Sequence, residues 1–371
     1  MLPLEDIRVL DFSTLLPGPF ATLILAEAGA EVIKVERPGG EPMRGQQPKY
    51  GDSAMLFGQL NRGKKSIELD LKDPDSVANL RPLIETADVL VEQFRPGVMD
   101  RLGLGWNTVH EINPRLIYCA ITGYGQSGPR LQEAGHDLNY AAETGLLSLS
   151  RAADGAPVIP HTQIADIGAG SYPAVMNIMF ALHARGRTGE GCFLDISMTD
   201  NLFPFTWMGI GLAQATGVWP TGADMALTGA SPRYQIYRAE DGIYVAVGAL
   251  EQKFWDNFCD AIELGAGYRD DRDDPASTIA EVARLIAAKP ASSWAKRFEG
   301  KDVCSVLMNS LEQAFHDPHF RQRGVFGHSL TQGRLAVAAL PMPLAPLFHG
   351  TDLKAGYPAL GNADALLYEP R

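Results

Sequence analysis

The sequence has little of what several common classes of protein depend on. Its cysteines number only four, Cys119, Cys192, Cys259 and Cys304, and they stand far apart, so neither a zinc motif nor a redox pair is indicated. No apolar run reaches the length that spans a bilayer, and the start, MLPLEDIRVLDFS, lacks the basic stretch of a secretion signal. We therefore expect a cytoplasmic protein in a reducing environment, with no membrane span.

Positive charge is also scarce. The formal net charge is −12 at pH 7, which argues against nucleic acid as a partner, because phosphate backbones bind to clustered positive surfaces. An anionic ligand would need local basic residues. With 371 residues, of which 46% are hydrophobic, the chain is long enough for two compact domains.

Alternation of strand-like and helical patterns fills the first 125 residues. The runs are, in order, IRVLDFS, PFATLILAEAGA, EVIKVERP, PDSVANLRPLIETA, DVLVEQFR and LIYCAITG. This order predicts an α/β fold with a parallel sheet. Ligands of such sheets bind beyond the carboxyl ends of the strands, which fall here at Arg37, Arg95 and the loop after Thr122.

Two long apolar helices and a hairpin are expected further on. A buried helix is predicted from Asp166 onward, and a second apolar helix within 201–221 would link the domains. The run YQIYRAEDGIYVAVGAL is typical of a β-hairpin. We predict a large domain over 1–200, completed by roughly 326–371, and a small α+β domain over 222–325.

The segment GYGQSG, residues 123–128, has the glycine spacing of a dinucleotide-binding loop. That fingerprint must open a helix, whereas Pro129 and a polar stretch follow here. We interpret the segment as a backbone turn.

Three segments carry residues suited to proton transfer. His136 and Asp137 precede a helical pattern, where free backbone N–H groups suit a developing oxyanion. Asp166 lies among apolar neighbours, which would raise its pKa toward the range of general acid–base catalysis. Glu251 follows a predicted strand. Each of these residues could instead be structural, as a helix cap or a core histidine, and spacing alone does not decide.

Histidines and methionines elsewhere have plainer interpretations. His316 and His319 flank Asp317 and Pro318, which look like the start of a helix, so no metal site is predicted there or anywhere else in the chain. Four methionines are core residues by default and could also form an adaptable wall for acyl chains: Met176, Met179, Met198 and Met208.

Together these segments resemble the class III CoA-transferase (CaiB/BaiF-type) superfamily, and within it the racemase branch that acts on α-methylacyl-CoA. The resemblance runs from about Asp6 to Asp317 and is carried by LDFSTLLPGPFAT, AEVIKVERP, NRGKKSIELDLK, ADVLVEQFRPGVMDRLGLG, NPRLIYCAITGYGQSGP, GHDLNY, the Asp166 segment and DGIYVAVGALEQKFW. Several motifs in the right order are more specific than any one of them.

The resemblance implies a Rossmann-like large domain, a smaller domain and an interlocked homodimer whose site is shared between chains. It assigns His136 and Asp166 as the two catalytic bases, Glu251 as the carboxylate that polarises the histidine, and Asp137 as a backbone N–H donor to the thioester oxygen. The implied CoA contacts are Arg37, Leu69, Asp70, Leu71, Lys72, Gln93, Phe94, Arg95, Arg101, Gly135, Leu138, Asn139 and Tyr140. A 2-methylacyl-CoA thioester is the implied substrate, and no cofactor is expected, since CoA is part of the substrate.

Two other functions stay open. In a CoA-transferase of the same superfamily, Asp166 would be a nucleophile that forms a mixed anhydride with the acyl group. The histidine in GHD and Glu251 favour proton abstraction instead. A non-catalytic acyl-CoA binding protein would keep the fold and the ligand without turnover.

Overall fold

The protein divides into two compact units. The structure, a computed structural model, describes residues 2–51, 53–152, 154–222, 224–350 and 354–368. One unit is made of Met1–Thr144, Pro160–Phe205 and Pro318–Arg371, and the other of Gly145–Ile159 and Thr206–Asp317. Residues 145–159, which the sequence places in the large domain, thus belong to the second unit.

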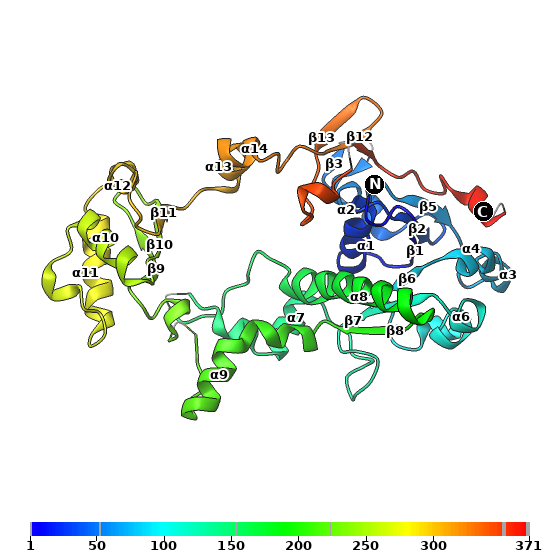
Figure 1. Cartoon of the computed structure of the whole chain (residues 1–371), viewed down its shortest axis with the longest axis horizontal. Helices are drawn as coiled ribbons and strands as arrows, with labels where there is room; N and C mark the ends of the chain where they lie inside the picture. The colour runs from blue at the N-terminus through cyan, green and yellow to red at the C-terminus, as the bar shows by residue number, and fades with distance from the viewer. Residues whose placement is uncertain (1, 52, 153, 223, 351–353, 369–371) are drawn as a thin grey trace. The chain divides into compact units, whose positions relative to one another are not determined.

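A six-stranded parallel sheet forms the centre of the first unit (Figure 1). Its strand order is β5-β2-β1-β6-β7-β8, so the chain winds outward in one direction from β1 and in the other from β6, as in doubly wound nucleotide-binding folds. The predicted parallel α/β sheet and Rossmann-like fold are confirmed. The strands are β1 (Arg8–Asp11), β2 (Glu31–Glu36), β5 (Lys65–Glu68), β6 (Val89–Glu92), β7 (Ile117–Thr122) and β8 (Phe193–Ser197).

Helices and short strands connect and cover this sheet. The long predicted helix over PDSVANLRPLIETA is two short helices, α3 (Pro74–Ala78) and α4 (Arg81–Thr86), because Pro82 stands in the first turn of the second one. The elements are α1 (Pro17–Glu27), β3 (Lys49–Tyr50), β4 (Ser53–Ala54), α2 (Met55–Asn61), α3 (Pro74–Ala78), α4 (Arg81–Thr86), α5 (Val98–Arg101), α6 (Trp106–Ile112), α7 (Asp137–Glu143) and α8 (Tyr172–Thr188).

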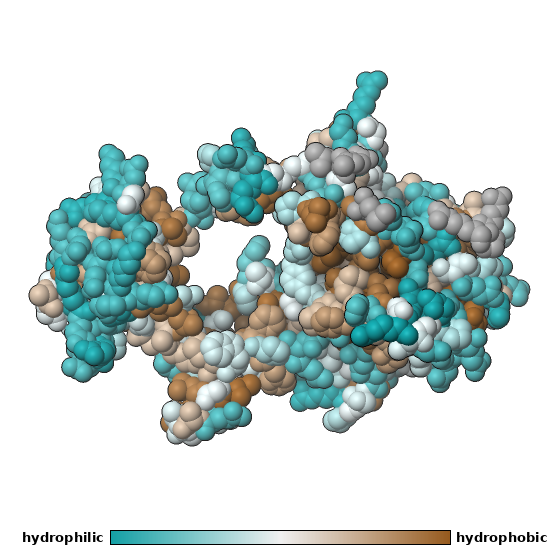
Figure 2. Space-filling view, viewed as in Figure 1, coloured by the Kyte–Doolittle hydropathy of each residue, from teal (hydrophilic) through white to brown (hydrophobic). Residues whose placement is uncertain are grey.

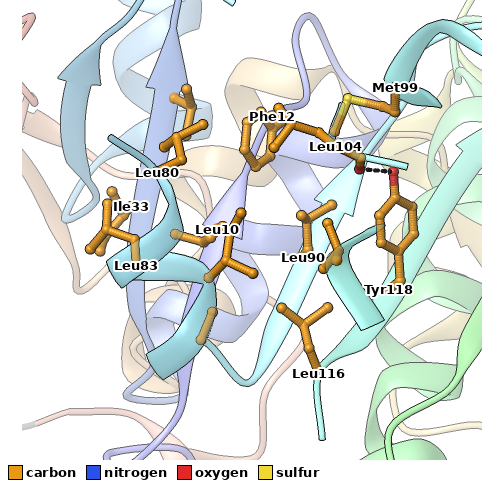
Figure 3. Close-up of a cluster of buried hydrophobic side chains, with 14 of the residues drawn as sticks. Leu10, Phe12, Ile33, Leu80, Leu83, Leu90, Met99, Leu104, Leu116 and Tyr118 are labelled. Atoms are coloured by element: carbon orange, nitrogen blue, oxygen red, sulfur yellow. Dashed lines mark hydrogen bonds between the residues drawn. The ribbon is translucent and has the colours of Figure 1, made fainter. Parts of the chain in front are cut away.

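One face of the sheet is packed with aliphatic side chains. Leu10 of β1, Ile33 of β2 and Leu90 of β6 lie in one hydrophobic cluster with Leu83 of α4, and all four are buried (Figure 3). Each such side chain contributes about 1.5 to 3 kcal/mol when it leaves water. Because all six strands run parallel, their carboxyl ends lie along one edge of the sheet.

Buried charges lie on the opposite face. Lys64 Nζ lies 3.1 Å from Asp11 Oδ2, and both side chains are fully buried. Burial alone would raise the pKa of Asp11, but Lys64 and Lys34 hold it well below its usual range. Ser13 joins the network, since its backbone N–H donates to Asp11 (2.9 Å) and its carbonyl accepts from Lys34 Nζ (2.7 Å). The network thereby anchors the loop that follows β1.

The second unit has an antiparallel sheet with the strand order β11-β10-β9. The predicted hairpin is confirmed, with Tyr244 opposite Arg238 and Gly248 opposite Tyr234. Trp255 and Trp294 are buried in a core between this sheet and its helices. The elements are α9 (Trp207–Thr216), β9 (Tyr234–Arg238), β10 (Tyr244–Gly248), α10 (Gln252–Ile262), α11 (Pro275–Ala287), α12 (Ala291–Phe298), β11 (Ser305–Leu307) and α13 (Leu311–His316).

The C-terminal segment returns to the first unit. Arg62 Nη2 donates to the carbonyl of Leu340 (2.6 Å), and the N–H of Ser66 donates to Asn362 Oδ1 (2.8 Å). These bonds attach the segment to the chain after α2 and to β5. Its elements are α14 (Pro318–Gln322), β12 (Ser329–Gln332), β13 (Leu335–Ala338) and β14 (Lys354–Gly356).

The prediction of a buried helix from Asp166 onward is wrong in two respects. The segment begins as a π-helix over Ile164–Ser171 and becomes α-helical only at Tyr172. Along α8, Tyr172, Met176 and Phe180 are exposed, with Phe180 at 62%. These three residues recur every four positions and form one apolar stripe.

The expected linker helix within 201–221 is also shorter than predicted. A 3₁₀ helix over Asp200–Thr206 precedes α9, which ends at Thr216 because Gly217 takes the left-handed conformation. Trp207 of α9 is 69% exposed, and Figure 2 shows hydrophobic side chains at the surface over α9.

Candidate active site

A cavity of about 440 Å³ opens beyond the carboxyl ends of β1, β6 and β7. This is the point where the strand order of the sheet reverses, the usual ligand position in doubly wound folds. The residues around it are Leu15, Pro17, Gln93, Phe94, Arg95, Pro96, Ile121, Thr122, Gly123, Tyr124, Leu131, Glu133, Ala134, Gly135, His136, Asn139, Tyr140, Asp166 and Met198. Both predicted catalytic bases, His136 and Asp166, are among them.

His136 is the N-cap of α7 and is exposed. Its backbone N–H donates to Asn139 Oδ1 at 3.0 Å. On its other side, Tyr140 Oη donates to the carbonyl of Gly135 at 2.6 Å, and any side chain at Gly135 would clash with the Tyr140 ring. Glycine is therefore needed at 135, and these contacts hold the segment that carries His136.

Asp137 is the first residue of α7, and its side chain reaches the Asp166 segment. Asp137 Oδ1 accepts hydrogen bonds from the N–H groups of Ala165 (2.7 Å) and Asp166 (3.0 Å). The carboxylate thus caps the start of the π-helix. The backbone N–H of Asp137 lies in the first turn of α7, where N–H groups lack intrahelical acceptors.

Asp166 is partly buried in the third position of the π-helix. Burial, together with the negative charge of Asp137, raises the pKa of Asp166 to about 7. A carboxyl in this range exchanges its proton near neutral pH, so it can either take up or deliver a proton.

The loop after β1 forms a wall of the cavity that sequence reasoning missed. Leu15 has φ 63°, in the left-handed region that favours glycine, and it faces the cavity together with Pro17. Gln93 holds this loop at both ends, since its Oε1 accepts from the N–H of Gly18 (3.1 Å) and its Nε2 donates to the carbonyl of Thr14 (2.6 Å). The Gln93 amide, predicted to contact CoA, is therefore engaged within the protein.

Six of the predicted CoA contacts line the cavity, and the others lie elsewhere. Arg37 follows β2, and its Nε donates to the carbonyl of Gly40 at 3.0 Å. Residues 69–72 follow β5, the neighbour of β2, and Arg101 ends α5. The cavity-lining residues of the predicted set are Gln93, Phe94, Arg95, Gly135, Asn139 and Tyr140, whereas Arg37, Leu69, Asp70, Leu71, Lys72, Arg101 and Leu138 are outside the lining.

Glu251 belongs to the second unit, where it is the exposed N-cap of α10. Its side chain makes no capping hydrogen bond, so capping does not account for a carboxylate at this position.

Several other lining residues carried no sequence signal. Tyr124, Leu131 and Glu133 lie in the irregular stretch between β7 and α7, where no periodic pattern marks one side as inward. Of the four methionines considered for an acyl wall, only Met198 lines the cavity. The segment 123–128 is a turn region that opens no helix, in agreement with its interpretation as a backbone turn.

Comparison with known proteins identifies the family. A model described as CoA-transferase family III matches residues 4–364, so the chain belongs to this family, as the motifs predicted. Alpha-methylacyl-CoA racemase from Homo sapiens is 36% identical over 355 residues, which cover 92% of this chain and 86% of that protein.

A CoA-transferase is nearly as similar. Succinyl-CoA:glutarate CoA-transferase from Homo sapiens is 33% identical over 339 residues, covering 87% of this chain and 75% of that protein. Among solved structures, Rv3272 from M. tuberculosis superposes with a TM-score of 0.84 at 28% identity, over 99% of both chains. In the described part of the chain, no helix combines the length and the apolar character needed to cross a membrane.

Proposed function

We propose that the protein is a racemase that inverts the α-carbon of 2-methylacyl-CoA thioesters by two-base proton transfer. The observation that carries this proposal is that His136 and Asp166 both line one cavity at the edge of the sheet. A base on each side of a planar enolate is what inversion needs, since one removes the proton and the other delivers it to the opposite face.

The chemistry requires that the enolate oxygen be stabilised, because a thioester α-proton is much less acidic than either side chain. Preorganised N–H donors supply such stabilisation in a site shielded from water. We assign this role to the backbone N–H of Asp137, next to His136. In one direction neutral His136 takes the proton while protonated Asp166 gives one, and the exchanged protonation states serve the reverse direction. A pKa of about 7 at Asp166 supports both uses.

CoA would lie along the carboxyl edge of the sheet. Arg95 in the cavity, together with Arg37, Lys72 and Arg101, provides positive charge for its phosphates on an otherwise acidic protein. Arg37 and Lys72 follow the adjacent strands β2 and β5, so they are neighbours on that edge.

A homodimer is part of the proposal. The exposed apolar stripe of α8, from Tyr172 to Phe180, is the kind of surface that subunit interfaces cover. Glu251, whose carboxylate makes no capping bond, would then polarise His136 of the partner chain.

A CoA-transferase is the second candidate, favoured by the 33% identity to succinyl-CoA:glutarate CoA-transferase. In that reaction Asp166 would attack the thioester carbonyl, expel CoA and form a mixed anhydride. His136 would have no part in it.

Deuterium uptake separates these functions. With 2-methylacyl-CoA in heavy water and no acceptor acid, we expect exchange at the α-carbon with loss of optical purity. Exchange should fall about 10²-fold or more in His136→Ala and in Asp166→Asn, whereas His161→Ala, an exposed histidine outside the cavity lining, should keep wild-type rates.

Two outcomes would overturn the proposal. No exchange, but transfer of CoA when succinate is added, would make the protein a transferase. Neither exchange nor transfer, with CoA still bound, would make it an acyl-CoA binding protein.

A further inference from the structure

Three side chains able to bind a metal meet in the first unit, away from the cavity. Glu27 is the last residue of α1, His328 directly precedes β12, and His349 follows the 3₁₀ helix Pro346–Phe348. One carboxylate oxygen and one ring nitrogen from each histidine all lie within 4.8 Å of one another. The two histidines belong to the returning C-terminal segment, so most of the sequence separates them from Glu27.

His349 presents a lone pair to this cluster. Its Nε2 lies 3.1 Å from the carbonyl oxygen of Leu344, and because a carbonyl only accepts, Nε2 carries the proton. The other nitrogen, Nδ1, is then an acceptor. It is buried, and no residue in the described ranges donates a hydrogen bond to it. A backbone carbonyl that fixes the tautomer in this way is typical of metal-binding histidines.

The carboxylate of Glu27 is oriented by a hydrogen bond from Arg62. Arg62 Nε donates to Glu27 Oε1 at 2.8 Å, and the Arg62 side chain is almost fully buried. The second oxygen, Oε2, faces His328, whose Nδ1 lies 3.2 Å away. Two ligand atoms of one tetrahedral zinc ion lie about 3.3 Å apart, given metal–ligand bonds of about 2.0 to 2.1 Å. The 3.2 Å between Glu27 Oε2 and His328 Nδ1 is close to that separation.

We propose that Glu27, His328 and His349 form a binding site for a divalent first-row transition metal such as Zn²⁺. Two imidazoles and one carboxylate are ligands that zinc accepts, whereas Mg²⁺ and Ca²⁺ prefer oxygen alone. An adjoining cavity of about 180 Å³, bordered by Glu27, Arg62 and His328, leaves room for water as the fourth ligand.

The metal would be structural, because it would join the end of α1 to both ends of the segment from His328 to His349. Closing a connection across most of the chain restricts the unfolded state strongly, so metal binding should stabilise the fold. No spacing pattern marks this site, because Glu27 lies far from His328 and His349 in the chain.

Zinc binding to the full chain tests the site without reference to catalysis. After treatment with a chelator and dialysis, ZnCl₂ should bind at one ion per chain in calorimetry and raise the melting temperature. His328→Ala and His349→Ala should each weaken zinc binding about tenfold or more. His161→Ala, an exposed histidine outside the cluster, is the matched control and should bind as the wild type does.

A second measurement keeps the test decisive if an alanine variant does not fold. Co²⁺ bound to the wild-type protein should give the intense visible absorption of a tetrahedral site, and His328→Gln, which keeps much of the side-chain volume, should lose it. No zinc binding by the wild type, or binding as tight as the wild type's in both histidine variants, would overturn the proposal. The cluster would then be a His328–Glu27 ion pair.

Discussion

Asp137 Oδ1 accepts hydrogen bonds from the backbone N–H groups of both Ala165 and Asp166, so one carboxylate fixes the segment that carries the other. The same side chain places a negative charge near Asp166, which raises the pKa of Asp166 beyond the effect of burial. Asp137 therefore acts on the neighbouring carboxyl in two separable ways, by position and by charge.

Replacing Asp137 by asparagine should separate these two effects. The amide oxygen of Asp137→Asn can still accept both N–H groups, but the charge is lost, so the pKa of Asp166 should fall below about 7. In the pH–rate profile for deuterium exchange, the limb that reports the titration of Asp166 should move to lower pH. Asp137→Ala, which also loses the two hydrogen bonds, should in addition lower kcat. A limb that stays in place or moves to higher pH in Asp137→Asn would contradict the electrostatic role.

Gln93 is expected to act by holding the loop from Thr14 to Gly18. Gln93→Ala removes two hydrogen bonds to backbone groups, each worth about 1 kcal/mol, so KM for the acyl-CoA should rise about 5- to 30-fold with a smaller change in kcat. Steady-state kinetics measure the split.

A double-mutant cycle with Leu15 identifies the mechanism of this effect. Leu15→Gly removes the steric cost of the left-handed conformation at φ 63°, because glycine adopts it readily, so Gln93→Ala should cost less in that background. Equal costs in both backgrounds would mean that Gln93 does not act through the loop.

Lys64 should be important for stability. Lys64→Met leaves the buried carboxylate of Asp11 without the cation that pairs with it, and breaking such a buried pair costs about 3 to 5 kcal/mol. Lys253→Met breaks an exposed pair with Asp302 and serves as the control, with little expected change. Thermal melting compares the two variants. Similar melting temperatures would show that the Asp11–Lys64 pair is not needed for stability.

Glu92 predicts a pH dependence of stability. Burial raises the pKa of this carboxyl from 4.5 to about 8 in the folded protein. Between these values the native state binds more protons than the unfolded state, so the free energy of unfolding should fall as pH rises from about 4.5 to about 8.

Glu92→Gln removes this titration while keeping an oxygen for the N–H of Phe94. The variant should gain stability relative to the wild type as pH rises from 6 to 8, by roughly 1 to 3 kcal/mol. Unfolding at both pH values measures the difference. A difference that does not grow with pH would show that Glu92 is already ionised in the native protein.

Local patterns were sufficient for the framework of the first unit. Strands such as Val89–Glu92 and Ile117–Thr122 are short apolar runs bounded by turns, and burial on both faces leaves such runs few alternatives to a parallel sheet. The motif GHD likewise marked His136 and Asp137, and the apolar neighbours of Asp166 predicted the direction of its pKa shift.

Tertiary structure decided the contacts between distant segments. The role of the Asp137 side chain, the clamp of Gln93 on the loop after β1, and the meeting of Glu27 with His328 and His349 have no local signature. In each case a side chain contacts backbone or side-chain groups that only folding brings near. Sequence determined which residue types were available for proton transfer and how the strands form, because both follow from the residues and their near neighbours. Folding alone set which of those residues share a cavity, because that depends on strand order and long-range packing.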